Sequence, residues 1–125
     1  MTEPTSEEVL AFISATFRSA WALELLCLLR TEPRRAWLPE ELVRALHASK
    51  LVVRHGVGAL AAVGLVTVGT DGTVSYEAPA HLEPLVSAVE QLYRTAPDAA
   101  RRAVARGNSQ SLTAFADAFR LRSDD

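Results

Sequence analysis

The chain has little cysteine: Cys27 stands alone among 125 residues and cannot close an internal disulfide. It lies in an apolar helical pattern, which is typical of a small core residue and fits a reducing compartment. Aromatic residues make up 6% of the chain, but hydrophobic residues make up 49%, an ordinary globular composition. A chain of this length needs no disulfide or metal for stability. We therefore expect a single cytoplasmic domain over residues 1–125.

Membrane and export signals are also missing. The first residues read MTEPTSEEV, which are acidic where a signal peptide needs basic residues. Residues 20–29 are apolar but too short to span a bilayer, and residues 51–68 are interrupted by Arg54, His55 and several glycines. We expect both segments to be buried elements, and we expect no membrane contact.

Patterns that carry catalysis or metal binding are absent from the sequence. His47, His55 and His81 do not have the spacing of a metal site, and Cys27 is remote from them. The serines show no nucleophile elbow, and the glycines form no phosphate loop. The sequence therefore predicts neither an enzyme nor a protein with a cofactor or metal.

Basic residues are few overall but gather in the middle of the chain. The net charge is -2, Glu3, Glu7 and Glu8 load the N-terminus, and Asp124 and Asp125 close the chain. The central basic residues are opposed locally only by Glu40 and Glu41, and they are Arg34, Arg35, Arg44, Lys50 and Arg54. This segregation permits a local basic face for nucleic acid on an acidic protein.

The first 32 residues predict one long helix. Thr5 or Ser6 can cap it, apolar residues recur at helical spacing from Val9 to Leu29, and Pro33 disfavours helix just before it. Such a helix is apolar almost all round, so several of its sides must be covered. We expect residues 1–32 to pair with a second copy of the chain. Coverage by helices of the same chain is the alternative.

Residues 38–78 predict two short helices and a β-hairpin. Pro39 occupies a first-turn position of a helix that ends near Ala48, and Ser49 can cap the next helix, which closes at Gly64. Residues 65–68 and 73–77 are β-prone and are joined through Asp71-Gly72, a strong hairpin signal. Residues 31–37 are predicted to form a loop.

Two glycines, Gly56 and Gly58, fall inside the second of these helices and cost about 1 kcal/mol each relative to alanine. We expect tight helix packing to explain them, ahead of close approach to a nucleic-acid backbone.

Residues 81–125 predict further helices. The first covers 81–95, a shorter one covers 98–106, and residues 107–110 are predicted as a loop. Ser111 can cap a last amphipathic helix whose apolar side carries Leu112, Phe115 and Phe119. That helix is too short to be stable alone, so it is a candidate contact for the same domain, a dimer mate or a protein partner.

One stretch resembles a known class of regulators. It runs Ser49, Val57, Leu60, Val63-Gly64-Leu65-Val66, then Thr70-Asp71-Gly72 and Tyr76. This pattern resembles the recognition helix and wing of bacterial winged-helix regulators, and the layout with flanking helices is similar to the MarR or PadR type. The resemblance covers residues 38–78. It implies a mainly α (α+β) fold with a small β-hairpin wing, a long N-terminal helix and C-terminal helices, and a homodimer that binds double-stranded DNA in transcription regulation.

The resemblance places the start of the helix after Ser49 in the major groove. Lys50 and Arg54 are four residues apart and share a face there. Arg54 can make a bidentate contact with guanine, and Ser49 can donate to a phosphate. His55 lies beside this face and could add a pH-dependent contact or simply pack. The expected phosphate contacts are Arg34, Arg35, Arg44 and Lys50.

Two other functions are compatible with the sequence. The wing tip carries Thr70 and Asp71 but no cation, and the chain is acidic overall. These features favour a winged-helix module that binds protein and not DNA. An effector-gated regulator is the third reading, with an apolar pocket near Trp21 and Tyr93, although core packing explains those aromatic residues more simply.

Overall fold

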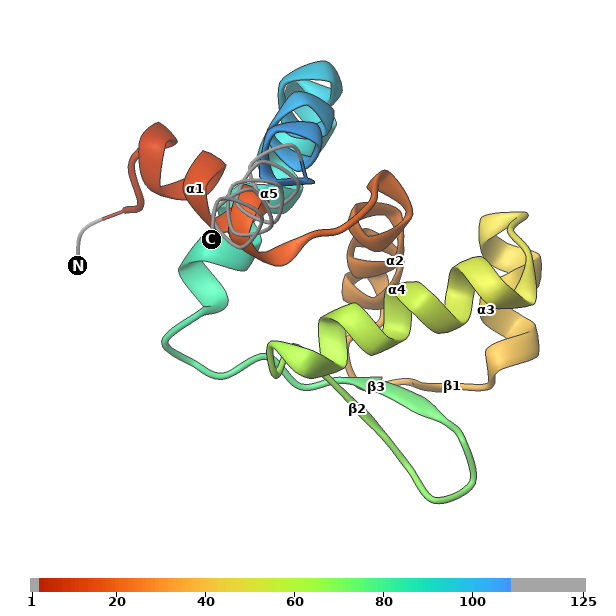
Figure 1. Ribbon diagram of the computed structural model, residues 1–125. Coiled ribbons are helices and arrows are strands. Elements are labelled where there is room, and N and C mark those ends of the chain that lie inside the picture. Colours follow the sequence, from red (N-terminus) through yellow and green to blue (C-terminus); the bar gives the residue numbers. More distant parts are fainter. Residues whose placement is uncertain (1–2, 109–125) are drawn as a thin grey trace, which may run out of the picture.

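The computed structural model describes residues 3–108, which form a mainly helical fold with one small antiparallel sheet (Figure 1). The elements are α1 (Ser6–Thr16), α2 (Ala20–Thr31), β1 (Ala36–Trp37), α3 (Pro39–Leu46), α4 (Lys50–Ala62), β2 (Val66–Val68), β3 (Val74–Tyr76) and α5 (Glu83–Thr95). Residues 97–108 are helical as well. The predicted mainly α class with a small β part is confirmed. The predicted last helix with Leu112, Phe115 and Phe119 lies outside the described residues.

The prediction of one continuous N-terminal helix was wrong. Thr5 caps α1 in a capping box with Glu8, but the helix ends at Thr16, and α2 starts afresh at Ala20. The two axes differ by 110°. Phe17 adopts extended geometry and is buried, and the Ser19 hydroxyl accepts a hydrogen bond from the Ala22 amide. A local cap and a buried aromatic side chain therefore break a run whose apolar spacing alone looks unbroken.

No single helix among residues 3–108 is long and apolar enough to cross a membrane. The bent pair α1 and α2 meets the length and composition criteria only when joined.

Helices α3 and α4 are joined by a short turn, as the sequence predicts. α3 ends at Leu46, and His47 takes the left-handed conformation (φ 53°) that reverses the chain direction. Ser49 then caps α4 by accepting a hydrogen bond from the Val52 amide. Gly64, at φ 80°, ends this region with the geometry expected of a glycine after a helix.

The sheet has three strands in the order β1-β3-β2, all antiparallel. The predicted hairpin is confirmed, with Val68 opposite Val74 and Gly72 at φ 85° in the turn. The predicted loop over residues 31–37 was partly wrong, because Ala36 and Trp37 form β1, in which Trp37 pairs with Val74 of β3. A strand of two residues is too short to show alternation, so the sequence pattern could not reveal it.

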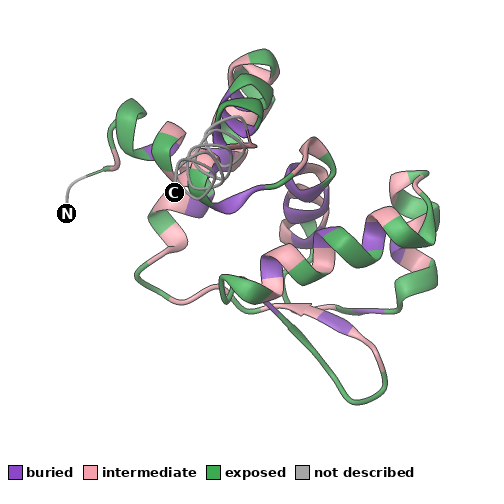
Figure 2. Cartoon of the chain, viewed as in Figure 1, coloured by how far each residue is buried: buried purple, intermediate pink, exposed green. Residues whose placement is uncertain are grey.

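The core is centred on α2, which packs against α4, α5, α3 and β3 of the same chain. Figure 2 shows that much of this helix is buried. Leu23, Leu25, Leu26 and Leu29 are at most 1% exposed. Cys27 is half-buried on this helix, and burial raises the pKa of its thiol to about 11. Helices of the same chain therefore cover α2 on several sides. The homodimer stays a prediction, and it no longer follows from the apolarity of this helix.

The two glycines of α4 occupy different surroundings. A Cβ at Gly56 would lie 3.3 Å from Cδ2 of Leu25 on α2, so the expected packing role is confirmed there. A Cβ at Gly58 would have no heavy atom within 4 Å, and Gly58 is exposed. Tight packing therefore explains Gly56 and not Gly58.

This contrast predicts that Gly58→Ala raises the free energy of unfolding by about 1 kcal/mol, because alanine restricts the unfolded chain and meets no obstacle in the helix. Urea denaturation of the full chain measures the change. A loss of stability would mean that an unseen group packs over Gly58.

Helix 97–108 lies against α1. The Ser14 hydroxyl donates a hydrogen bond to the Ala103 carbonyl at 2.9 Å, and the Asn108 amide donates to the Arg18 carbonyl at 3.0 Å. Residues 107 and 108 are helical, so the predicted loop from Gly107 was wrong at those two positions. Gly107 looks like a helix terminator in the sequence, but here it allows close approach to α1.

Candidate nucleic-acid interface

The predicted contact residues start at the exposed N-terminal part of α4. Ser49 is used as the cap, and its oxygen accepts from Val52 while its O–H can still donate to another group. Lys50, Arg54 and His55 follow on the first turns of the helix, and all three are exposed. The amide groups of this helix end and two cations thus face solvent together.

A groove lies beside this helix end, between α3, α4 and the hairpin formed by residues 66–76. Figure 1 shows how these three elements are placed. Its volume is about 570 Å³. It is lined by Pro39, Glu40, Leu42, Val43, Arg44, Lys50, Val53, Arg54, Val57, Val68, Gly72 and Val74. We call it the α3–α4–hairpin groove.

Three of the predicted cations meet at this groove. Arg44 comes from α3, while Lys50 and Arg54 come from α4. Among residues 3–108, none of the three has a carboxylate within ion-pair distance. Glu40 is the acidic residue of the lining. The groove therefore carries an excess of positive charge that intramolecular ion pairs leave uncompensated.

Arg35 differs from these cations because its guanidinium group is engaged within the chain. It lies 3.6 Å from the ring centroid of Trp37 and pairs with Glu32 at 2.8 Å and with Glu41. Hydrogen bonds from the Leu38 amide and from Arg35 lower the pKa of Glu41. The structure thus gives Arg35 a role in fixing the entrance to α3. The neighbouring Arg34 is exposed and, within the described chain, has no ion-pair partner.

The tip of the hairpin is held by Asp71. Its Oδ1 accepts hydrogen bonds from the Thr73 amide at 3.1 Å and the Thr73 hydroxyl at 2.7 Å. These two bonds lower the pKa of Asp71, so it is ionised at neutral pH. The carboxylate therefore serves the turn, and the tip presents negative charge where a phosphate contact would need a cation.

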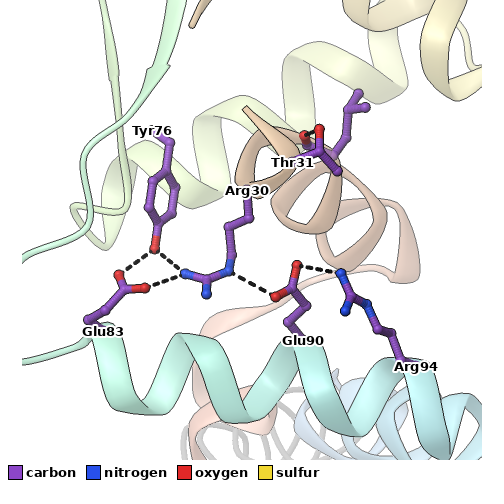
Figure 3. Close-up of polar contacts among 7 residues, drawn as sticks. Arg30, Thr31, Tyr76, Glu83, Glu90 and Arg94 are labelled. Carbon is purple, nitrogen blue, oxygen red and sulfur yellow. Dashed lines mark hydrogen bonds and ion pairs between the residues drawn. The ribbon is translucent and has the colours of Figure 1, made fainter. Parts of the chain in front are cut away.

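A polar cluster around Arg30 fixes the hairpin and α5 against α2 (Figure 3). Its Nη1 donates to Glu83 at 2.6 Å and to the Tyr76 hydroxyl at 2.8 Å, and its Nε donates to Glu90 at 3.3 Å. The Tyr76 hydroxyl in turn donates to Glu83 at 2.8 Å. Burial, followed by the bond to Glu83, raises the pKa of Tyr76 to about 12. One arginine thus connects a strand and two helices.

The α3–α4–hairpin groove does not coincide with the effector pocket that the sequence predicts near Trp21 and Tyr93. The Tyr93 hydroxyl donates to Glu24, and Arg101 lies 5.7 Å from its ring centroid. Trp21 is 40% exposed on α2. The α3–α4–hairpin groove is lined by other residues, so the pocket at Trp21 stays a prediction.

Comparison with known proteins gives no relative. No protein-family model, no curated protein and no solved structure matches this chain. Within residues 3–108, no three histidine, cysteine, aspartate or glutamate side chains gather as a metal site would require.

Sequence reasoning found the cations but missed the groove beside them. Its apolar wall combines α3, α4 and both hairpin strands, which no local pattern brings together. It also missed the Arg30 cluster. A signal for that cluster existed, because Arg30 is a charge at the end of a strongly apolar helix and Tyr76 lies two residues after Val74 in the same strand.

Proposed function

We propose that this protein is a DNA-binding transcriptional regulator of the winged helix-turn-helix class, acting as a homodimer. The observation that carries the proposal is the meeting of Arg44, Lys50 and Arg54 around the exposed start of α4, with the hairpin beside it. Uncompensated cations at an exposed helix end are what a phosphate backbone attracts.

The order of the elements supports this proposal. Helix α2, the short strand β1, helix α3, a tight turn, helix α4 and the β2–β3 hairpin follow one another along the chain. In a winged helix-turn-helix, the helix after the turn enters the major groove and the hairpin is the wing. The turn between α3 and α4 consists of His47, Ala48 and Ser49, which is a length typical of helix-turn-helix units. In this assignment α4 is the recognition helix.

The proposed roles follow from position. Arg54 reads a guanine, and Lys50, Arg44 and Arg34 bind phosphates. Ser49 donates to a phosphate at the start of α4, and His55 lies at the edge of the contact. Arg35 contacts Trp37 and Glu41, which fixes the start of α3 and so positions the interface.

The homodimer is proposed because the wing lacks a cation. A unit that grips DNA with one helix and no basic wing gains affinity when two copies bind adjacent half-sites. Trp21 on α2 is an exposed large hydrophobic side chain available for such an interface.

Replacing Arg54 tests the readout role. We expect Arg54→Ala to weaken binding to a preferred DNA site by about 1–3 kcal/mol, which is roughly 5-fold to 150-fold, and to weaken nonspecific binding much less. Fluorescence anisotropy with a preferred duplex and a scrambled duplex measures both affinities. Arg102→Ala is the matched control, because Arg102 is an exposed arginine on helix 97–108.

Equal losses on the two duplexes would remove Arg54 from base readout and leave it as a phosphate contact. If Arg102→Ala weakened binding as much as Arg54→Ala, the interface would have to be placed elsewhere on the protein.

A winged-helix module that binds protein is the second candidate. The net charge of -2 and the acidic hairpin tip favour it, because both oppose nucleic acid. This candidate differs from the first in one measurable property: the folded protein would have no affinity for DNA even at low salt.

A further inference from the structure

The α3–α4–hairpin groove has an apolar wall that DNA binding does not require. Six of its lining residues are aliphatic: Leu42, Val43, Val53, Val57, Val68 and Val74. Val68 is 51% exposed, although a polar residue would serve at this position in a protein whose groove contacts only phosphates. Leu42, Val53 and Val74 are core side chains, at most 4% exposed, so packing of the fold explains them. Val43 and Val57 are partly exposed, and together with Val68 they leave an apolar surface in the groove that a phosphate backbone does not use.

The same groove is rimmed with positive charge. Arg44, Lys50 and Arg54 line it together with a single carboxylate, that of Glu40. A pocket with an apolar wall and a few charged groups at one side is the usual form of a small-molecule site, and its volume of about 570 Å³ lies in the range of such sites. The charge of the rim calls for an anionic head on an apolar ligand.

The lining residues also indicate what kind of apolar group the ligand would carry. No phenylalanine, tyrosine or tryptophan is among the lining residues, so the groove offers no ring for stacking. Val43, Val57 and Val68 keep exposed surface in the groove and suit a flexible aliphatic chain, whose burial is favourable without any specific geometry.

We propose that the groove binds an alkanoate of medium chain length, with the chain against the valines and the carboxylate between Arg44, Lys50 and Arg54. The regulatory consequence of this binding rests on the proposed function. The bound carboxylate neutralises the cations that would hold DNA phosphates, so alkanoate and DNA compete for the protein. By linkage, each ligand then lowers the affinity for the other by the same factor.

Octanoate is the probe, and the full-length protein without DNA is the sample. Amide chemical shifts in ¹⁵N-labelled protein report the titration. We expect saturable changes confined to α3, the first half of α4 and the hairpin. Octylammonium has the same chain and the opposite charge, and octanol has no charge. We expect octanoate to bind about tenfold more tightly than either, the effect of one charge-assisted contact.

Two pairs of variants locate the site. Val68→Asp places a negative charge in the groove, whereas Thr67→Asp places it one residue earlier in β2, on the opposite face of the strand and outside the lining. Arg44→Gln removes a cation of the rim, and Arg102→Gln removes an exposed cation on helix 97–108. We expect Val68→Asp and Arg44→Gln to weaken octanoate binding about tenfold, and the two controls to leave it unchanged.

Several results would overturn the proposal. Equal binding of octanoate and octylammonium would show nonspecific apolar association, and shift changes near Trp21 would place the ligand elsewhere. An absence of saturable change at millimolar octanoate would leave the groove without this ligand. A rise in mass on titration would assign the wall to self-association. Because no DNA is present, these outcomes are independent of whether the protein binds DNA. Competition with a labelled duplex then tests the regulatory link separately.

Discussion

Arg30→Met is expected to lower the free energy of unfolding by about 3 kcal/mol. The side chain of Arg30 is 15% exposed and contacts Glu83, Glu90 and Tyr76. Methionine keeps much of the apolar length but leaves Glu90, which is also 15% exposed, without its buried partner. Removing one member of a buried ion pair typically costs about 3–5 kcal/mol, and the half-exposed Glu83 places this case at the lower end. Urea denaturation measures the loss.

Arg94→Met is the matched control, since Arg94 also contacts Glu90. That contact, at 3.4 Å, is about as long as the one from Arg30 to Glu90, at 3.3 Å, but the Arg94 side chain is 65% exposed. We expect a loss below about 0.5 kcal/mol, the usual value of an exposed pair within a helix. If the two variants lost equally little, Arg30 would not organise the hairpin and α5 in the way described.

The same cluster predicts a dependence on pH. Burial raises the pKa of Glu83, but hydrogen bonds from Arg30 and Tyr76 outweigh it, so the pKa falls below its ordinary value of 4.5. The folded state therefore binds the Glu83 proton less readily than the unfolded state. The stability from this group is complete above pH 4.5 and is lost as the pH falls through the lowered pKa. In Arg30→Met this part of the acid sensitivity should shrink, which denaturation at a series of pH values measures.

Gly107→Ala is expected to destabilise the protein by more than 2 kcal/mol, although alanine is the better helix former by about 1 kcal/mol. A Cβ at residue 107 would overlap the Ser14 carbonyl oxygen and lie 2.8 Å from the carbonyl carbon. These are backbone atoms of α1, so no side chain can move aside. Helix 97–108 must then shift away from α1, which also strains the hydrogen bond from Ser14 to Ala103.

Gly58→Ala provides the opposite sign within the same protein, because it is the same substitution in a helix with open space around it. A stabilising effect of Gly107→Ala, comparable to that expected at Gly58, would show that α1 and helix 97–108 do not approach as closely as the structure has them.

Caps and turns of residues 38–78 could be predicted from the sequence because their signals are local. Ser49, Gly64 and Asp71-Gly72 act through their immediate neighbours, and the structure has each where the pattern indicated. The break after Thr16 was missed because apolar spacing continues through it. There the deciding residues are Ser19, a modest cap signal, and Phe17, whose burial depends on packing elsewhere.

The candidate site was only partly predictable for a similar reason. Exposure of Lys50 and Arg54 follows from helix periodicity, so sequence reasoning reached them. That Arg44 joins them, while Arg35 turns to Trp37 and Glu41, depends on how α3 is placed against α4 and β1. Contacts between elements decide which cations remain available, and no local pattern records such contacts.

Binding of the purified protein to a genomic fragment library, read at two salt concentrations, tests the central claim most directly. The proposal predicts enriched fragments that share a site, with affinity falling steeply as salt rises, because Arg44, Lys50, Arg54 and Arg34 displace counterions. The Arg54→Ala protein should lose the enrichment. A folded protein that enriches no fragment even at low salt would contradict the account and leave the protein-binding module as the function to pursue.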